Sequence, residues 1–552
     1  MAGVELILIL LAVSAALQIL AWRWRLPHPI LLVLGGAILA LVPGLPRIAI
    51  NPEVVFLLFV PPLLYWTTAF TTSLREFRRE IWPIARLGVG LVLVTIVAVA
   101  VVAHALEPRL PWAAAFALGA IVAPPDPVAA TAVMRPLRAP APLVSILEGE
   151  GLINDATALV AYRTAVAAVV TGSFSPVRAG LGLVLAGVGG VAVGLLVGAA
   201  IVWVRRRVWG LTVVENTVSL LTPFAAYLPA DAIGASGVLA VVATGLYIGR
   251  RAPLGVPAVT RLQAEAMWRM VAFILESLIF ILIGFELAYT LPTVERQSIG
   301  RFLGIGLAIS GVVIVVRLLW VFPSAYLGPL VARRRRGDAT RQPEMPPWKW
   351  VAFVGWAGVR GGDSLVIALA LPLATAAGAP FPGRVLILLV TFAVIFATLV
   401  VQGITLGPLL HLLRLREDES APAEEAHARR VAAEAALNRL AEIGRGGDVH
   451  PAAKRRLRHM YAQKMRRWGA LDRERHGAVD EEHRALKAVD ADGARGEWES
   501  YRRLASETIT AERRALVDLR DRGVIDDAVL RRIQRDLDLE TALLHAAGEE
   551  TP

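Results

Sequence analysis

Residues 119–163 read GAIVAPPDPVAATAVMRPLRAPAPLVSILEGEGLINDATALVAYR, and this stretch decides the fold. It is apolar enough to lie in a lipid bilayer, yet it carries four carboxylates, on Asp126, Glu148, Glu150 and Asp155. A charged side chain at the centre of a bilayer costs at least about 2.5–3.5 kcal/mol, so such residues mark a function or a specific partner. The stretch therefore predicts a polar site inside a membrane protein.

Three prolines surround the first of these carboxylates: Pro124 and Pro125 precede Asp126, and Pro127 follows it. Because proline lacks a backbone N–H and clashes with the preceding turn, a helix cannot run through this point unbroken. Irregular backbone at membrane depth is tolerated only where it is buried in protein or lines a cavity. We therefore expect an interrupted membrane helix with Asp126 at the break.

The next apolar segment carries Asn154 and Asp155, which we place in the same site as Asp126. A carboxylate holds either a proton or a metal ion, and hard cations are bound by oxygen ligands. The hypothesis is a site at which Na⁺ or K⁺ competes with H⁺ for Asp126 and Asp155, so that the two ion flows are coupled. Unwound backbone carbonyls at the break, such as that of Pro125, would add neutral oxygen ligands to the cation. Asp155 would face the ion, and Asn154 would orient it or cap the broken helix.

The whole composition agrees with a polytopic membrane protein. The chain has 552 residues, 56% of them hydrophobic, with a mean hydropathy of +0.58. It contains no cysteine, which excludes disulfides and thiolate metal sites. The net charge is +11, and arginines lie in short loops between apolar segments, so topology explains the charge better than nucleic acid as a partner.

Thirteen apolar segments are long enough to cross or nearly cross a bilayer. They are residues 4–22, 29–44, 53–71, 84–106, 112–134, 142–170, 179–204, 211–228, 234–249, 264–290, 302–330, 349–375 and 384–413. Basic clusters follow the odd-numbered segments, as Arg205–Arg207 follow the seventh. Because basic loops stay in the cytoplasm, we expect a multi-pass protein of the cell membrane with its N-terminus outside and its C-terminus inside.

The composition changes abruptly near residue 416, so we take residues 1–416 as the transmembrane domain. Residues 417–552 are highly charged and contain no apolar run long enough to span a membrane. Helical spacing recurs at 431–440, 454–468 and 529–544, with breaks expected at Gly446, Gly447 and Gly523. These features predict a helical cytoplasmic tail with a regulatory role.

A second interruption is predicted around Arg360, in the sequence GWAGVRGGD at 355–363. Each glycine lowers helix stability by roughly 1 kcal/mol, and four of them gather here. Two interrupted spans far apart in an apolar chain are typical of a transporter built from inverted repeats. If the two breaks cross, Asp126 would offset the positive half-helix ends and Arg360 the negative ends. Asp363 would join this polar cluster or cap the second half-helix, and we favour the cap.

Two further carboxylates need an explanation at membrane depth. We expect Glu150 to form an ion pair, because a buried carboxylate without a partner does not stay charged. Arg317 and Arg360 are the candidate partners, and Arg317 is preferred. Glu276, central in the tenth segment, would serve as a proton relay or an ion-funnel residue, or would pair with an arginine.

Several of these motifs together resemble the cation:proton antiporter-1 family, which includes bacterial sodium/proton antiporters. They are FLLFVPPLLY at 56–65, APPDPVAATAV at 123–133, EGEGLINDATALV at 148–160, GVRGGDSLVIALALP at 358–372 and RDRGVIDDAVLRRIQRDLDLE at 520–540. The resemblance implies an all-α antiporter fold of about thirteen transmembrane helices with two crossed, interrupted helices. It also implies a homodimer that exchanges monovalent cations for protons by alternating access, in pH and salt homeostasis. No enzymatic activity and no cofactor are implied.

The resemblance further implies a division into a moving core and a dimerisation domain. Core helices would lie at about 84–170 and 302–413, and dimerisation helices at about 1–71 and 179–290. Residues carried over from the family motifs are Asp126, Asn154 and Asp155 for cation and proton binding, Glu150 and Arg317 for a structural ion pair, Arg360 for the second broken helix, and Glu276 for a functional acidic position.

The chain departs from the family pattern at two positions. Pro125 stands where many members have Thr, and Gly151 stands where many have Ser. Both missing hydroxyls are candidate cation ligands elsewhere in the family. Their absence argues against a strict preference for Na⁺. Na⁺ stays the first expectation for the transported cation, with K⁺ and Li⁺ as alternatives.

Two other classes of protein stay open on the sequence. An intramembrane aspartyl protease also needs two membrane aspartates, and Gly361-Gly362-Asp363 has a faint likeness to such a site. That class leaves the proline break at Asp126 and the Asn154-Asp155 pair unexplained. A cation channel would need a continuous pore and would show no obligatory proton exchange.

Overall fold

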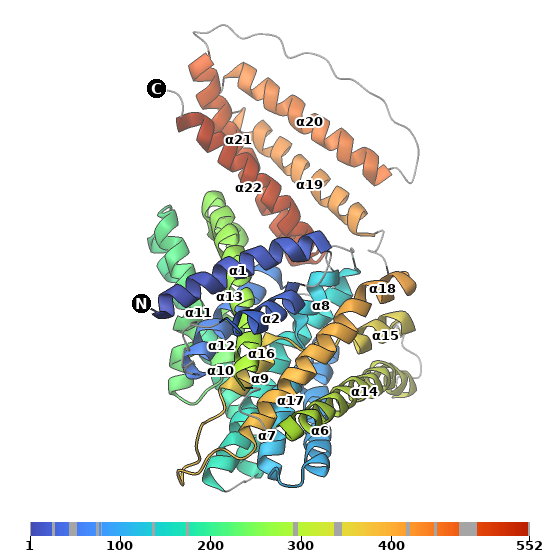
Figure 1. The fold of residues 1–552 in the computed structure, drawn as a ribbon. Helices are drawn as coiled ribbons and strands as arrows, with labels where there is room; N and C mark the ends of the chain where they lie inside the picture. The colour runs from blue at the N-terminus through green and yellow to red at the C-terminus, as the bar shows by residue number, and fades with distance from the viewer. Residues whose placement is uncertain are drawn as a thin grey trace. The chain divides into compact units, whose positions relative to one another are not determined.

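The computed structural model describes residues 2–24, 28–42, 52–72, 77–78, 80–134, 139–172, 176–290, 296–335, 345–415, 420–445, 450–473 and 494–549. Within these ranges the chain forms helices and no β-strand, with one isolated bridge between Ala374 and Pro380 (Figure 1). Helices pair their backbone groups within one segment, which is what the interior of a bilayer demands. The expected all-α fold class is confirmed.

The chain divides into two compact units. The first comprises Met1–Ile201, Leu220–Ile248 and Met267–Arg416, and the second comprises Val202–Ser219, Gly249–Ala266 and Glu417–Pro552. Helices α10, α11, α12 and α13 therefore run from one unit into the other.

Each of the thirteen predicted apolar segments coincides with one helix or with a run of helices. The helices are α1 (Ala2–Trp24), α2 (His28–Leu39), α3 (Pro52–Trp66), α5 (Ile81–Ala85), α6 (Val92–Leu106), α7 (Trp112–Val122), α8 (Pro127–Met134), α9 (Ala141–Thr171), α10 (Pro176–Arg207), α11 (Thr212–Ala232), α12 (Gly237–Gly255), α13 (Ala258–Thr290), α14 (Arg296–Arg335), α15 (Trp348–Trp356), α16 (Gly362–Leu369), α17 (Arg384–Thr398) and α18 (Ile404–Leu412). Short π-helical turns follow α3 at Thr67–Thr71, α5 at Arg86–Leu91 and α17 at Leu399–Gly403.

Among the residues that the structure describes, six stretches are long and apolar enough to cross a membrane by themselves. They are Ile81–Leu106, Pro142–Thr171, Gly180–Arg207, Ala258–Ala288, Ser298–Leu327 and Arg384–Leu412. Other apolar helices are shorter, such as His28–Leu39 and Trp112–Val122. The multi-pass membrane class is thus supported, while the number of thirteen complete crossings stays a prediction.

Both predicted interruptions are present. α7 ends at Val122 and α8 begins at Pro127, so four residues around Asp126 leave the helical path. α15 ends at Trp356 and α16 begins at Gly362, with Arg360 in the gap. The sequence locates both breaks because proline and glycine act on the backbone locally.

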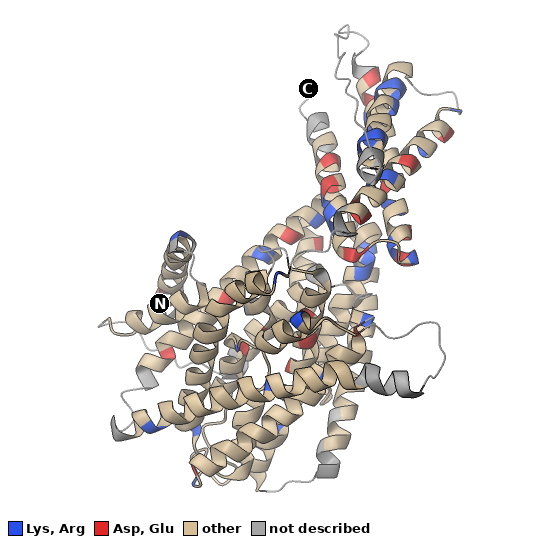
Figure 2. Ribbon diagram, turned by 90° about the vertical axis from the view of Figure 1, so that its right-hand side faces the viewer, with Lys and Arg blue, Asp and Glu red and all other residues tan. Residues whose placement is uncertain are grey.

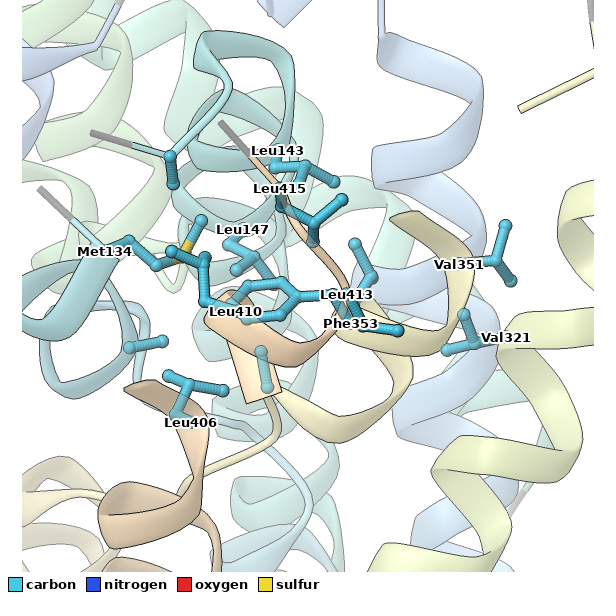
Figure 3. Close-up of a cluster of buried hydrophobic side chains, with 14 of the residues drawn as sticks. Met134, Leu143, Leu147, Val321, Val351, Phe353, Leu406, Leu410, Leu413 and Leu415 are labelled. Carbon is cyan, nitrogen blue, oxygen red and sulfur yellow. The ribbon is translucent and has the colours of Figure 1, made fainter. Parts of the chain in front are cut away.

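A buried apolar cluster packs one half of each interrupted helix (Figure 3). Its labelled members are Met134, Leu143, Leu147, Val321, Val351, Phe353, Leu406, Leu410, Leu413 and Leu415. They come from α8, α9, α14, α15 and α18 and from the residues that follow α18. Lipid is as apolar as leucine, so van der Waals packing of this kind is what holds membrane helices together. The cluster ties α8 and α15 to the long helices around them.

Glycine allows α2 to lie directly on the backbone of α13. A Cβ atom at Gly36 would stand 2.0 Å from the carbonyl oxygen of Ile281, and one at Gly284 would stand 1.8 Å from that of Val33. No side chain fits into either space, and small residues at such crossings are a common way for membrane helices to approach closely. The two glycines thus fix α2 against the long helix α13.

The tail forms four helices: α19 (Ser420–Ile443), α20 (Pro451–Arg473), α21 (Ala494–Arg522) and α22 (Asp527–Glu549). The predicted helical stretches fall within α19, α20 and α22, and the expected break at Gly523 lies between α21 and α22, with φ at 78°. Gly446 and Gly447 lie outside the described residues. Figure 2 shows Lys, Arg, Asp and Glu recurring along the tail helices, whereas most residues of the first unit are uncharged.

A polar cluster is buried at the centre of the tail. The Tyr461 hydroxyl on α20 donates a hydrogen bond of 2.6 Å to the Glu512 carboxylate on α21, which is only 4% exposed. Burial raises the pKa of Glu512. Lys464 on α20 and Arg429 on α19 oppose that rise, and Glu540 on α22 adds to it. The other three tail helices thus each place a charged group near this carboxyl.

A raised pKa gives a definite sign to the pH dependence of the tail. The folded tail binds the Glu512 proton more tightly than the unfolded tail, so this stabilisation is complete at low pH and is lost as pH rises through the folded pKa. We predict that Glu512→Gln, which keeps a hydrogen-bond acceptor but cannot ionise, flattens this dependence. Amide hydrogen exchange of α21 in the full-length protein, corrected for intrinsic rates between pH 5 and pH 8, measures it.

The matched control for this variant is Glu507→Gln on the same helix. Glu507 lies at the surface and pairs with Arg439 at 3.0 Å. Glu507→Gln should leave the pH dependence of amide hydrogen exchange in α21 as in the wild type. A pH dependence in Glu512→Gln equal to that of the wild type would show that ionisation of Glu512 is not its cause.

Candidate functional site

The two helix breaks contact each other directly. The backbone N–H of Asp126 donates a hydrogen bond of 2.7 Å to the carbonyl oxygen of Val359. In return, the Arg360 guanidinium donates to the carbonyl oxygen of Ala123. Buried backbone groups need partners, and each break here supplies a partner to the other. The site is therefore built from α7, α8, α15 and α16 together.

Asp126 lies at the N-terminus of the half-helix α16. A Cβ atom on Gly361 would stand 1.7 Å from Oδ2 of Asp126, so the carboxylate fills the space that any other residue would need. Gly361 is the residue that precedes the first turn of α16. The N-terminus of a helix carries partial positive charge, which stabilises an anion next to it. Asp126 itself is 9% exposed.

Helix α9 adds Asn154 and Asp155 to this arrangement. The Asn154 side chain is fully buried, and its Nδ2 donates a hydrogen bond of 3.0 Å to the carbonyl oxygen of Pro125. Asp155 is partly buried and lies within electrostatic range of Asp363 and Asp126. The structure thus brings the three sequence-predicted residues to one place, with Asn154 holding the broken backbone.

Gly151 explains how α9 approaches the first break so closely. A Cβ atom at this position would stand 2.3 Å from Cγ of Pro127, the first residue of α8. The position at which many family members carry Ser is therefore occupied here by the proline ring. Pro125, the other departure, contributes its carbonyl oxygen to Asn154.

Asp363 does not cap α16, and the preference for a cap in the sequence analysis is wrong. The residue that precedes the helix is Gly361, and no side chain makes a capping hydrogen bond there. Asp363 is instead the second residue of α16, within electrostatic range of Asp126. Asp363 therefore lies in the polar cluster with Asp126, which was the other alternative for this residue.

Glu276 on α13 also reaches this region. Its carboxyl is partly buried and lies within electrostatic range of Asp126 and Asp363. Four carboxyl groups, from α9, α13, α16 and the first break, therefore share one neighbourhood.

Arg360 is the buried cation of the second break. Its side chain is fully buried, its backbone N–H donates a hydrogen bond of 3.1 Å to Oγ1 of Thr398, and its guanidinium contacts the carbonyl of Ala123 at the C-terminal end of α7. The C-terminus of a helix carries partial negative charge. Arg360 and Asp126 thus lie at helix ends of opposite sign, as the sequence analysis expected for crossed breaks.

Glu150 and Arg317 form a bidentate ion pair. Nη1 and Nη2 of Arg317 lie 2.5 and 2.8 Å from Oε1 and Oε2 of Glu150, and both side chains are 1% exposed. Nε of Arg317 donates to the carbonyl oxygen of Val354 at 3.1 Å. Gly358 leaves room for this, because a Cβ atom there would stand 2.4 Å from Cδ of Arg317. The pair links α9, α14 and α15.

Sequence reasoning missed two polar residues that support the second break. Thr398 accepts from the backbone of Arg360, and Nε2 of Gln402 donates a hydrogen bond of 2.9 Å to the carbonyl oxygen of Trp356, where α15 ends. Both are fully buried. The available signal was that they are polar residues within the otherwise apolar segment 384–413.

Comparisons with known proteins agree with this fold and with exchange of cations for protons. The family model described as "Sodium/hydrogen exchanger, transmembrane" matches residues 8–412. An uncharacterized Na⁺/H⁺ exchanger of Mycobacterium tuberculosis is 34% identical over 98% of this chain and 96% of its own length. A sodium, potassium, lithium and rubidium/H⁺ antiporter of Bacillus subtilis is 32% identical over 70% of this chain and 58% of its own length.

A solved structure supports the fold. The sodium proton antiporter from Methanocaldococcus jannaschii at pH 8 matches with a TM-score of 0.52 and 18% identity, over 74% of this chain and 98% of that one. At this identity the likeness establishes the fold alone. Taken with the family match, it shows that the chain belongs to the sodium/hydrogen exchanger family and is a multi-pass secondary exchanger of monovalent cations and protons.

Proposed function

We propose that H⁺ and the transported cation compete for Asp126 and Asp155. The observation that carries this proposal is the contact of the two breaks, which brings the Asp126 carboxylate to the start of α16, within range of Asp155. A protonated carboxyl has no charge with which to hold a cation, and a bound cation excludes the proton. Release of one ion is then the condition for binding the other, which couples the two flows.

Na⁺ is the proposed principal cation, with K⁺ and Li⁺ as further substrates. Among the described residues, no group of three or more His, Cys, Asp or Glu side chains is placed to hold a metal ion. A cation between Asp126 and Asp155 would therefore complete its shell with water and backbone carbonyls, as hard cations do. Pro125 and Gly151 offer no hydroxyl, which favours a permissive site. The cations in the name of the Bacillus relative support that breadth.

Alternating access in this proposal is a movement of the core, at about 84–170 and 302–413, against a scaffold at about 1–71 and 179–290. An apolar boundary between the proposed core and the proposed scaffold supports this movement. A small cavity between α3, α13 and α16 is lined by Phe59, Ile279, Leu282, Ile283, Leu365, Val366 and Leu369. These side chains are apolar and form no hydrogen bonds, so sliding of α16 past α3 and α13 would break none. The scaffold would also form a homodimer, as the family resemblance implies.

The surrounding charges take supporting roles in the same proposal. The Glu150–Arg317 pair holds α9 to α14 and α15, and removing one partner of such a buried pair costs about 3–5 kcal/mol. Glu276 and Asp363 pass protons to the site. The chain works in the cell membrane with its N-terminus outside and its tail in the cytoplasm, has no cofactor and catalyses no covalent reaction.

The first prediction concerns the two proposed ligands. Asp126→Asn and Asp155→Asn should each reduce cation-driven proton movement to background, because an amide binds neither ion as a carboxylate does. The measurement is recovery of a quenched pH dye in proteoliposomes after addition of Na⁺, K⁺ or Li⁺. Asp231→Asn is the control, since that carboxylate pairs with Arg163 near the surface and is 40% exposed.

The same assay, together with measurements of cation flux and of proteolysis, separates the alternatives. An Asp155→Asn variant that exchanges like the wild type would remove the site assignment. Cation flux without proton movement would indicate a channel, and proteolysis of a membrane peptide that depends on Asp363 would indicate a protease.

The second prediction concerns the space at Gly361. Gly361→Ala adds a Cβ atom where Oδ2 of Asp126 lies, 1.7 Å away, so the carboxylate must move and exchange should fall strongly. Gly304→Ala on α14 is the control, because its Cβ atom meets nothing within 4 Å. Initial exchange rates and melting temperatures of both variants are compared. Equal exchange by both variants would show that the position of Asp126 is not critical.

A further inference from the structure

The tail makes a specific contact with one short segment outside it. Residues Gly249–Ala266, which hold the end of α12 and the start of α13, belong to the same compact unit as Glu417–Pro552. α13 then continues to Thr290 and carries Glu276. Whatever fixes this segment therefore fixes one end of a helix that reaches the proposed site.

Arg261 is the centre of the contact. Its Nε donates a hydrogen bond of 2.8 Å to Oδ2 of Asp538 on α22, and its Nη2 contacts Oδ1 of the same carboxylate. Its Nη1 donates to the carbonyl oxygens of Ala252 and Pro253 at 3.3 and 3.2 Å and also contacts that of Val256. The last carbonyl groups of a helix lack partners within it, so Arg261 joins the end of α12, the start of α13 and the tail.

The tail side of the contact is equally well defined. Asp538 is 3% exposed and also accepts from Nη2 of Arg513 on α21, at 2.6 Å. Gln534 on α22 donates to the carbonyl oxygen of Pro253 at 3.2 Å, and Arg520 on α21 donates to that of Arg250 at 3.3 Å. Two tail helices thus supply hydrogen bonds to the end of α12.

Two exposed ion pairs lie around this buried centre. Arg535 on α22 lies 3.6 Å from Glu265 on α13, and Arg250 on α12 lies 3.8 Å from Asp521 on α21. Exposed pairs contribute little stability and are screened by salt. The buried Arg261–Asp538–Arg513 group is therefore the part of the contact that resists salt.

We propose that the tail is a brace of the scaffold, seated on the α12–α13 junction through Arg261 and Asp538, and that it stays seated while the core moves. This inference rests on the proposed function, because it uses the division into core and scaffold. The contacts named above all end on residues 250–265, which belong to the proposed scaffold. Removing either partner would leave an uncompensated buried charge, so the seat favours a permanent contact over a cyclic one.

The first test locks the tail in place. The chain has no cysteine, so one introduced pair is unique. Glu265→Cys with Arg535→Cys replaces an exposed ion pair, and a short bis-methanethiosulfonate reagent links the two thiols reversibly. The locked protein in proteoliposomes should exchange Na⁺ for H⁺ at the rate of the unlinked double variant. Loss of exchange on linking, with recovery on reduction, would overturn the brace. If the wild-type protein itself showed no exchange of Na⁺ for H⁺, that result would instead count against the proposed function.

The second test releases the tail. Asp538→Ala should speed amide hydrogen exchange in residues 249–266 and lower the initial ion-exchange rate several-fold, because the end of α13 is no longer held. Asp538→Asn, which keeps the shape but removes the charge, should act in the same direction. Hydrogen exchange in α19 reports whether the tail itself remains folded in each variant.

The matched control is Asp536→Ala on the same helix. Asp536 pairs with Arg429 within the tail at 2.5 Å. The Asp536→Ala variant should leave amide hydrogen exchange in residues 249–266 unchanged. Wild-type protection of 249–266 in Asp538→Ala, or a wild-type ion-exchange rate, would overturn the proposal.

Discussion

The structure depends on one constraint: charge and unpaired backbone placed at membrane depth must find their partners in the protein. Interrupting a helix exposes carbonyl and N–H groups that lipid does not hydrogen-bond. In this chain each interruption is satisfied by the other, through Asp126 N–H to Val359 and through Arg360 to Ala123. Neither break is stable alone, which is why the two interrupted helices meet and why the site forms where they do.

The same constraint explains the distribution of glycine around the site. Gly361 leaves space for the Asp126 carboxylate, Gly358 for the Arg317 side chain, and Gly151 for Pro127. Each glycine stands where a polar or irregular part of one segment lies against the backbone of another. Close approach shortens the hydrogen bonds and excludes lipid from between the segments. The charged groups are thereby held by the protein, while the surrounding apolar clusters supply the packing.

Local chemistry allowed much of this to be predicted from the sequence. Pro124 to Pro127 and the glycines around Arg360 act on their own backbone, so both breaks were predicted correctly. Burial of Glu150 required a cation, and only two arginines were candidates. The cap assigned to Asp363 was wrong because capping depends on backbone direction at Gly361, which residue type does not reveal. Thr398, Gln402 and the Arg261–Asp538 contact join distant parts of the chain, and no periodicity predicts such pairs.

The central claim is that H⁺ and the transported cation displace one another at the same carboxylates. The most direct measurement is Na⁺ binding to the purified wild-type protein by titration calorimetry, over a range of pH and in buffers of different ionisation enthalpy. The account predicts that binding of Na⁺ releases protons. At acid pH, the affinity of the protein for Na⁺ should fall by up to about tenfold for each unit by which the pH is lowered. An affinity independent of pH, with no proton released, would contradict it.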